Sequence, residues 1–271
     1  MSLKDSIRSA ASRYPAVKAT LKIVSSPFRS LTSARYARID GRDRDGKAGQ
    51  LRDAWRAEAI PAKQRAVVDP QLRAYRQGTP IKAFDVLVDM VRALSAAAVA
   101  GRAPLSLLEV GCSSGYYSEI FAIKGLNVVY AGCDYSAPFI QLARKMYPAL
   151  DFKVEDATAL GYADETFDVV VSGCCILHIP DYEDAVREAA RVSRRYVIFY
   201  RTPVLHTRPT TYYTKLAYGT KTIEIHFNEQ DLVALFAEHG LRIVGIVSLD
   251  VGWQRGDAYA TKCYLCEKSR S

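Results

Sequence analysis

The sequence predicts an α/β fold: a seven-stranded, mostly parallel sheet, doubly wound by helices, with an antiparallel seventh strand. The first observation is an apolar run over 105–110, followed by a turn bracketed by Gly111 and Gly115 and by helical spacing from Tyr116. The second is the alternation of strand and helix patterns along residues 127–240. The third is a closing pair of extended segments, 241–249 and 257–267, joined by a turn and therefore antiparallel.

The turn after the first strand is the candidate ligand site. A strand, a glycine turn and a helix let a ligand approach bare backbone, because a Cβ would block either the turn or the ligand. A dinucleotide fingerprint reads G-x-G-x-x-G, but Ser113 stands at its second glycine. Glu109 precedes Gly111 within the strand. A carboxylate there suits an ammonium-bearing amino-acid ligand and would repel a pyrophosphate. The alternative is a turn that binds no ligand.

Acids follow the next two predicted strands. The strand over 127–133 ends at Asp134, and in doubly wound folds an acid about 20 residues past the glycine turn hydrogen-bonds ribose hydroxyls. The alternative for Asp134 is an acid that only stabilises a turn. A third short strand over 151–154 precedes Asp156 and Ala157. A fourth, buried strand begins at 167–168, and its carboxyl end, 172–178, should line the same cleft.

These features together resemble class I S-adenosyl-L-methionine (SAM) dependent methyltransferases with a domain of the type 11/12 kind. The resemblance rests on Glu-x-Gly-x-x-x-Gly at 109–115, on the acids after strands two and three, and on Phe-Asp-Val-Val before Cys-Cys-Ile-Leu-His. It covers residues 105–201 strongly and implies a Rossmann-like fold with SAM as the cofactor. In that family an acid at the place of Asp156 hydrogen-bonds the adenine amino group, and the next backbone N–H, here of Ala157, serves a ring nitrogen. The cofactor-binding residues that we expect are Glu109, Gly111, Cys112, Ser113, Gly115, Asp134, Tyr135, Asp156, Ala157, Cys174 and Tyr75. For Tyr75, on an earlier helix, ordinary packing is the alternative.

The chemistry that SAM implies needs little covalent help from the protein. The methyl group leaves a sulfonium cation by in-line displacement, so positioning of the acceptor supplies most of the acceleration. A base is needed only when the acceptor must lose a proton; His178 and His226 are the candidates, with a positioning or packing role as the alternative for His178. The favoured function is O-methylation of a small-molecule or glycan hydroxyl. The alternatives are C- or N-methylation of a lipophilic small molecule and a non-catalytic SAM-binding regulatory subunit.

The positive charge is concentrated at the N-terminus. The chain has a net charge of +8, and residues 1–50 hold 11 Lys/Arg and 4 Asp/Glu, so the rest of the chain carries about +1. We therefore expect no nucleic-acid partner. Residues 1–31 show helical apolar spacing between basic residues, broken by Pro15 and Pro27. Such a helical N-terminal extension either lies on an anionic membrane surface through residues 1–38, or packs on the body or on the partner of a homodimer.

The remaining organisation follows from composition. Residues 39–50, with alternating charges and three glycines, predict a linker that completes the extension 1–50. Residues 51–100 form a helical cap region interrupted by prolines at 61, 70 and 80, and 101–271 form the methyltransferase domain, with an irregular acceptor lid at about 202–226.

Three features of the sequence bear on the cellular compartment and on metal binding: its cysteines, its apolar runs and the spacing of possible metal ligands. The chain lacks an apolar run of membrane-spanning length and a signal-peptide pattern, and its six cysteines lack a zinc-like pattern. We expect a cytoplasmic protein with reduced thiols, peripheral on the inner membrane face if the extension binds lipid. Cys263 and Cys266 should point to opposite faces of a strand, which makes them structural thiols. No clustered His/Asp/Glu set indicates a metal site.

Overall fold

The structure, a computed structural model, describes residues 36–39, 44–97, 104–254 and 257–269. Within these ranges no helix is long and apolar enough to cross a membrane. Most of the N-terminal extension, residues 1–35, lies outside the described residues, so its predicted helices and membrane contact stay predictions.

The central sheet has the predicted seven strands. In spatial order they are β4 (Asp151–Val154), β3 (Val128–Asp134), β2 (Leu105–Val110), β5 (Phe167–Gly173), β6 (Ser193–Leu205), β10 (Asp257–Lys268) and β9 (Leu241–Gln254). Neighbours pair in parallel from β4 to β6, whereas β10 is antiparallel to both β6 and β9. The predicted doubly wound sheet with an antiparallel seventh strand is therefore confirmed.

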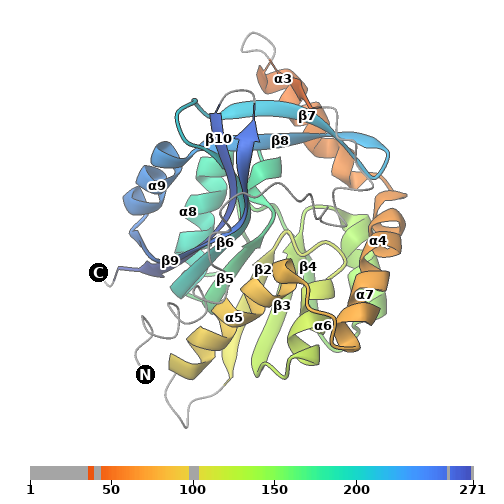
Figure 1. Cartoon of the computed structure of the whole chain (residues 1–271). Coiled ribbons are helices and arrows are strands. Elements are labelled where there is room, and N and C mark those ends of the chain that lie inside the picture. The colour runs from red at the N-terminus through yellow and green to blue at the C-terminus, as the bar shows by residue number, and fades with distance from the viewer. Residues whose placement is uncertain (1–35, 40–43, 98–103, 255–256, 270–271) are drawn as a thin grey trace.

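Helices cover both faces of this sheet (Figure 1). On one face β2 contributes Leu107 to a core with α4 (Ile60–Arg76), α5 (Lys82–Ala97), α6 (Tyr116–Ile123) and part of α7 (Ala137–Met146). On the other face Leu108 joins a core with α8 (Tyr182–Val192) and α9 (Glu229–Glu238). The alternation that separates Leu107 from Leu108 also separates Cys263 from Cys266, which lie in different cores, as predicted. All six cysteines are free thiols.

The segment predicted as an irregular lid is instead a β-hairpin. The strands β7 (Thr211–Ala217) and β8 (Thr220–Asn228) pair antiparallel, and β8 joins the sheet beside residues 204–205 of β6. The short β1 (Ala37–Arg38) adds to the outer edge of β7. Alternating side chains, with Ile223, Ile225 and Phe227 inward, give the hairpin a buried face that drives strand formation. With these three strands the described sheet has ten.

The predicted linker is also wrong, because residues 44–53 form helix α3 (Arg44–Asp53), followed by the 3₁₀ turn η1 (Ala54–Arg56). Packing outweighs the low helix propensity of the two glycines in α3, since Ala48 is only 1% exposed against the core that holds β8. The break predicted at Pro70 is absent from α4, which carries this proline in its interior between the buried Val68 and Leu72.

Candidate functional site

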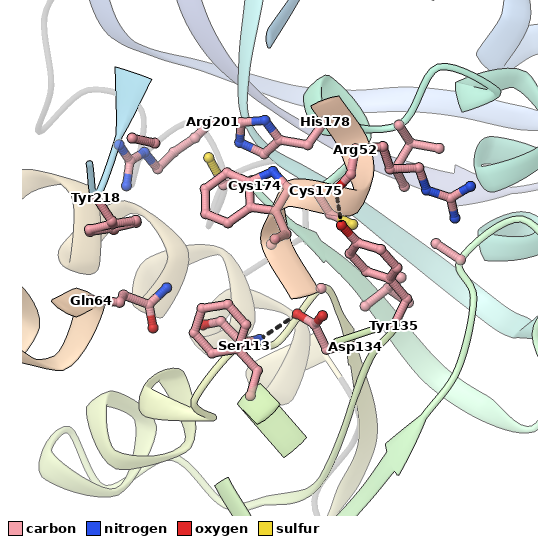
Figure 2. Close-up of a pocket in the computed structure, with 18 of the residues that line it drawn as sticks. Arg52, Gln64, Ser113, Asp134, Tyr135, Cys174, Cys175, His178, Arg201 and Tyr218 are labelled. Atoms are coloured by element: carbon pink, nitrogen blue, oxygen red, sulfur yellow. Dashed lines mark hydrogen bonds between the residues drawn. The ribbon is translucent and has the colours of Figure 1, made fainter. Parts of the chain in front are cut away.

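A cavity of about 460 Å³ lies at the carboxyl ends of β2, β3, β5 and β6. Its other walls come from α3, η1 and α4 and from the turn between β7 and β8. Figure 2 shows Asp134 and Ser113 on one side of this pocket, and Arg201, His178 and Tyr218 on the opposite side. The sheet's carboxyl edge is the place where doubly wound folds bind ligands.

Asp134 is held ready as a hydrogen-bond acceptor on the floor of the cavity. One carboxylate oxygen accepts from the backbone N–H of Ser113 at 3.0 Å, and the other accepts from Ser136 N–H at 2.9 Å. Burial raises the pKa of Asp134 to about 6, and these two N–H groups oppose the shift, so the group is ionised at pH 7. A carboxylate has about four lone-pair sites, so two remain for the vicinal hydroxyls of a ribose.

The two glycines of the turn are required by the protein's own packing. Both have φ of +72°. A Cβ on Gly111 would lie 2.6 Å from the Sγ of Cys175, and one on Gly115 would lie 2.6 Å from the ring of Phe152. Gly111 lines the cavity and exposes its backbone there, whereas Gly115 and the buried Cys112 lie behind the cavity wall.

Glu109 lies directly beneath the cavity floor. Its Oε2 accepts from the Tyr130 hydroxyl at 2.5 Å, and its Oε1 lies 2.6 Å from where a Cβ on Gly173 would be. Because Gly173 lines the cavity without a side chain, only its backbone separates this carboxyl from a ligand. Burial raises the pKa of Glu109 to about 8, and a ligand ammonium would favour the ionised form.

Because its pKa is raised in the folded state, Glu109 should lower the free energy of unfolding as pH rises. As pH rises from 4.5 to 8, the unfolded chain releases the proton that the folded chain retains, so stability falls. Glu109→Gln cannot ionise. We therefore expect the difference in melting temperature between this variant and wild type to shift in favour of the variant from pH 5 to pH 8, by about 2–4 °C for each kcal/mol of unfolding free energy that wild type loses. Thermal unfolding at both pH values measures the difference. Glu238→Gln, at an exposed site, is the control, and an equal difference at the two pH values for Glu109→Gln would contradict the argument.

Asp156, which the resemblance places at the adenine of the cofactor, does not line the cavity. Its Oδ1 accepts from the backbone and hydroxyl of Thr158, and its Oδ2 accepts from Arg52 at 2.5 Å. Partial burial would raise the pKa of Asp156, but the hydrogen bonds from Thr158 and Arg52 outweigh it and hold the pKa below its usual value. Glu155 and Ala157 line the cavity, and Asp156 does not. Ala157 therefore lines the cavity, and its contact with adenine stays a prediction, while Asp156 is held by Arg52.

The segment formed by α3 and η1 covers this end of the cavity, and its first part had been predicted to be a linker. Its residues meet the loop after β3: the Tyr135 hydroxyl donates to the backbone oxygen of Arg52 (Figure 2), and Ser136 Oγ donates to that of Trp55 at 3.0 Å. Ser136 is the N-cap residue of α7, and its side chain makes no capping hydrogen bond there. Arg52, Trp55 and Tyr135 all line the cavity. A lone Trp55 in a polar stretch was the available signal.

His178 is the histidine that reaches the cavity. Its Nδ1 lies 2.6 Å from the backbone oxygen of Ile223, and a carbonyl only accepts, so Nδ1 carries the proton and Nε2 is the basic nitrogen. Burial lowers the pKa of His178 to about 4, although Glu224 opposes the shift, so the ring is neutral at pH 7. Trp55 lies against it with ring centroids 4.8 Å apart.

Two other predicted residues lie away from the cavity. His226 is 1% exposed, and its Nε2 lies 3.0 Å from Glu224 Oε1 within a ring of tyrosines. Tyr75 packs against Phe84, and its hydroxyl donates to Asp85 at 2.6 Å. The structure thus shows the packing alternative for Tyr75, and it does not bring His226 to the place where a base could act.

Backbone strain concentrates around the cavity. Of the five described non-glycine residues with positive φ, four line it: Ser113, Cys174, Arg201 and Tyr218. Conformations of this kind cost about 1–3 kcal/mol each and gather at functional sites. Cys174 and Cys175 both line the cavity, within the segment 172–178 that was expected there. Among the described residues, no group of three or more His, Cys, Asp or Glu side chains is placed to hold a metal ion.

Comparison with known proteins identifies the domain around this cavity. Residues 108–200 match the family model described as "Methyltransferase domain". The chain is 33% identical over 88 residues to the demethylmenaquinone methyltransferase of Renibacterium salmoninarum, covering 32% of this chain and 36% of that protein. It is 32% identical over 95 residues to the phosphatidylethanolamine N-methyltransferase of Cereibacter sphaeroides, covering 33% and 45%. The chain thus spans less than half the length of these curated relatives.

A solved structure supports the fold alone. The [4+2]-cyclase SpnF has a TM-score of 0.50 with 16% identity, over 68% of this chain and 81% of that one. Because that protein is described as a cyclase, fold likeness does not fix the reaction. Residues 108–200 therefore form a methyltransferase domain, in agreement with the resemblance to the class I SAM-dependent methyltransferase family. The cofactor of that family is SAM, and the Asp134 carboxylate, the bare backbone of Gly111 and the Glu109 carboxyl beneath Gly173 fit its ribose and its amino-acid end.

Proposed function

We propose that the protein is a SAM-dependent methyltransferase that methylates a phenol-type hydroxyl of a small molecule. The observation that carries the choice of an oxygen acceptor is His178, a neutral imidazole at the cavity whose proton is committed to the Ile223 carbonyl. SAM supplies the methyl group on a sulfonium cation. The residues of this chain bind and orient the two partners and take up the acceptor's proton.

The cofactor half of the cavity is formed by the ends of β2, β3 and β4. Asp134 would hold the ribose hydroxyls, Ala157 would meet the adenine, and Glu109 would compensate the ammonium group through the gap left by Gly173. Tyr135 also lines the cavity, and hydrogen bonds join the loop that carries it to Arg52 and Trp55. Positional control of the methyl group is the main source of acceleration.

The acceptor half favours an acidic hydroxyl. A histidine with a pKa near 4 is a weak base, and proton transfer to it from a sugar alcohol is far more uphill than from a phenol, whose pKa is about 10. Trp55 and Tyr218, with ring centroids 6.1 Å apart, give that half aromatic walls on which a planar ring can lie. Both features support a phenol over the glycan hydroxyl that the sequence left open.

The test is methyl transfer from label-bearing SAM to a matched panel of phenols, sugars and amines. Label on phenol oxygens is the expected result. Label on sugars, on amines or on carbon would overturn the choice of acceptor and keep the enzyme class. If S-adenosylhomocysteine binds and no acceptor is labelled, the non-catalytic alternative replaces the proposal.

For the extension, we propose contact with an anionic membrane surface. Residues 1–38 hold eight Lys/Arg and one acid, Asp5, and each basic residue near such a surface contributes about 1 kcal/mol. We expect flotation with anionic vesicles at low salt, weakening as salt rises, and its loss on deletion of residues 1–35. That deletion spares Tyr36, whose hydroxyl donates to Glu224 at 2.8 Å. If the protein does not float with the vesicles and the deletion alters its oligomeric state, the extension instead packs on the body or on the partner of a homodimer.

A further inference from the structure

The end of the cavity opposite the cofactor half gathers positive charge. Arg201 and Lys215 line it from β6 and β7, and Lys63 lines it from α4. Figure 2 shows the guanidinium of Arg201 beside Tyr218 and His178, on the acceptor side. These cations come from three elements that the cofactor motifs do not include, so they belong to a separate part of the site.

Carboxylates line the cofactor half, whereas the Glu224 carboxylate near the acceptor half is buried and forms an ion pair with Lys215. Among the described residues that line the cavity, the carboxylates are Asp134 and Glu155, which follow β3 and β4. The acceptor half therefore presents cations and aromatic rings without a lining carboxylate. A positively charged acceptor would be repelled there by Arg201 and by the sulfonium of the cofactor, whereas an anionic acceptor would be attracted by both.

The backbone conformation positions Arg201, and an ion pair positions Lys215. Arg201 follows Tyr200, whose backbone oxygen accepts from Cys174 N–H at 3.0 Å, and both Arg201 and Cys174 have a φ of +58°. The Lys215 ammonium donates to Glu224, and the same carboxylate accepts from Tyr36. An arginine carries five donors in a fixed fork that matches the geometry of a carboxylate or a phosphate.

Lys63 reaches the same end from the other wall. Its Nζ lies 3.4 Å from where a Cβ on Gly219 would be, which places the ammonium against the turn between β7 and β8. Lys63 is exposed, while Arg201 is partly buried. The positive charge thus extends from the mouth of the cavity inward, and it can guide an anion toward the aromatic walls.

We propose that the acceptor carries a carboxylate or phosphate group on a planar ring, with Arg201 and Lys215 binding the anion while the ring lies beside Trp55 and Tyr218. The inference rests on the proposed function, because it names the class of acceptor for the same site. It makes Arg201 a residue that determines specificity. His178 remains the base, and Asp134 remains on the cofactor.

The test is calorimetry of the full chain saturated with S-adenosylhomocysteine. The probes are benzoate and phenyl phosphate, with benzamide as the neutral match and benzylamine as the cation. We expect at least one of the two anions to bind at least about tenfold more tightly than benzamide, and Arg201→Gln to remove that preference. The comparison of the two anions decides between carboxylate and phosphate. Lys221→Gln, an exposed cation on the same hairpin outside the cavity, is the matched control.

The outcomes separate this inference from the proposed function. Equal binding of benzamide and both anions by the wild-type chain, or no binding of either anion at millimolar concentration, overturns the inference without any variant. It is also overturned if Arg201→Gln weakens S-adenosylhomocysteine binding more than twofold, since Arg201 would then hold the cofactor. Failure of the wild-type chain to bind S-adenosylhomocysteine overturns the proposed function itself.

Discussion

Replacing His178 by glutamine lowers kcat for a phenol acceptor by about 100- to 10,000-fold, the usual contribution of a general base, and leaves S-adenosylhomocysteine affinity within twofold. Glutamine can still donate to the Ile223 carbonyl, so the hairpin contact is kept while the basic nitrogen is lost. Steady-state kinetics with SAM and the phenol identified in the labelling experiment measure both parameters. His206→Ala, at an exposed histidine outside the cavity, is the control.

The pH profile of the wild-type enzyme tests the same role. Burial lowers the pKa of His178 to about 4, so the neutral base is present above that value and is lost as pH falls through it. We expect kcat to be independent of this group from about pH 5 upward. An inflection near the ordinary histidine pKa of 6.5, or an undiminished kcat in His178→Gln, would remove His178 as the base.

Asp134→Asn weakens S-adenosylhomocysteine binding at least about tenfold, because hydrogen bonds to a charged group contribute about 1.5–3 kcal/mol each and 1.4 kcal/mol is a factor of ten. The side chain keeps its size, but an NH₂ group replaces one carboxylate oxygen. This NH₂ then faces a backbone N–H that had donated a hydrogen bond to that oxygen. Calorimetry measures the affinity, and thermal unfolding checks that the turn at Ser113 is retained.

The matched control for this substitution is Asp164→Asn. Asp164 pairs with Arg191, and its side chain is 75% exposed, outside the cavity lining. An affinity of Asp134→Asn equal to that of this control, with both proteins folded, would show that Asp134 does not hold the cofactor.

The parts of the fold that the sequence predicted are those set by local pattern. Leu107 and Leu108 alternate between two cores, and the glycine turn follows them within the same few residues, so periodicity and turn chemistry suffice. Asp134 was found in the same way, from its place at the end of a predicted strand about 20 residues past the glycine turn.

What the sequence missed depends on contacts between distant segments. Helix α3 contains two glycines and forms because Ala48 packs on a hairpin more than 150 residues away, which no local propensity records. The hairpin itself turns His226 from the cavity, because Glu224 and His226 share one face of β8 and point to the tyrosines around them. The role of Arg52 was missed because it lies in α3. Its hydrogen bond to Asp156 joins segments more than 100 residues apart, which a local sequence pattern does not record.

Calorimetric titration of the full chain with S-adenosylhomocysteine tests the central claim, that the carboxyl edge of this sheet is a SAM site. The arrangement of Asp134, Gly111 and Glu109 predicts one binding site per chain. A titration of the folded protein that shows no detectable binding would contradict it.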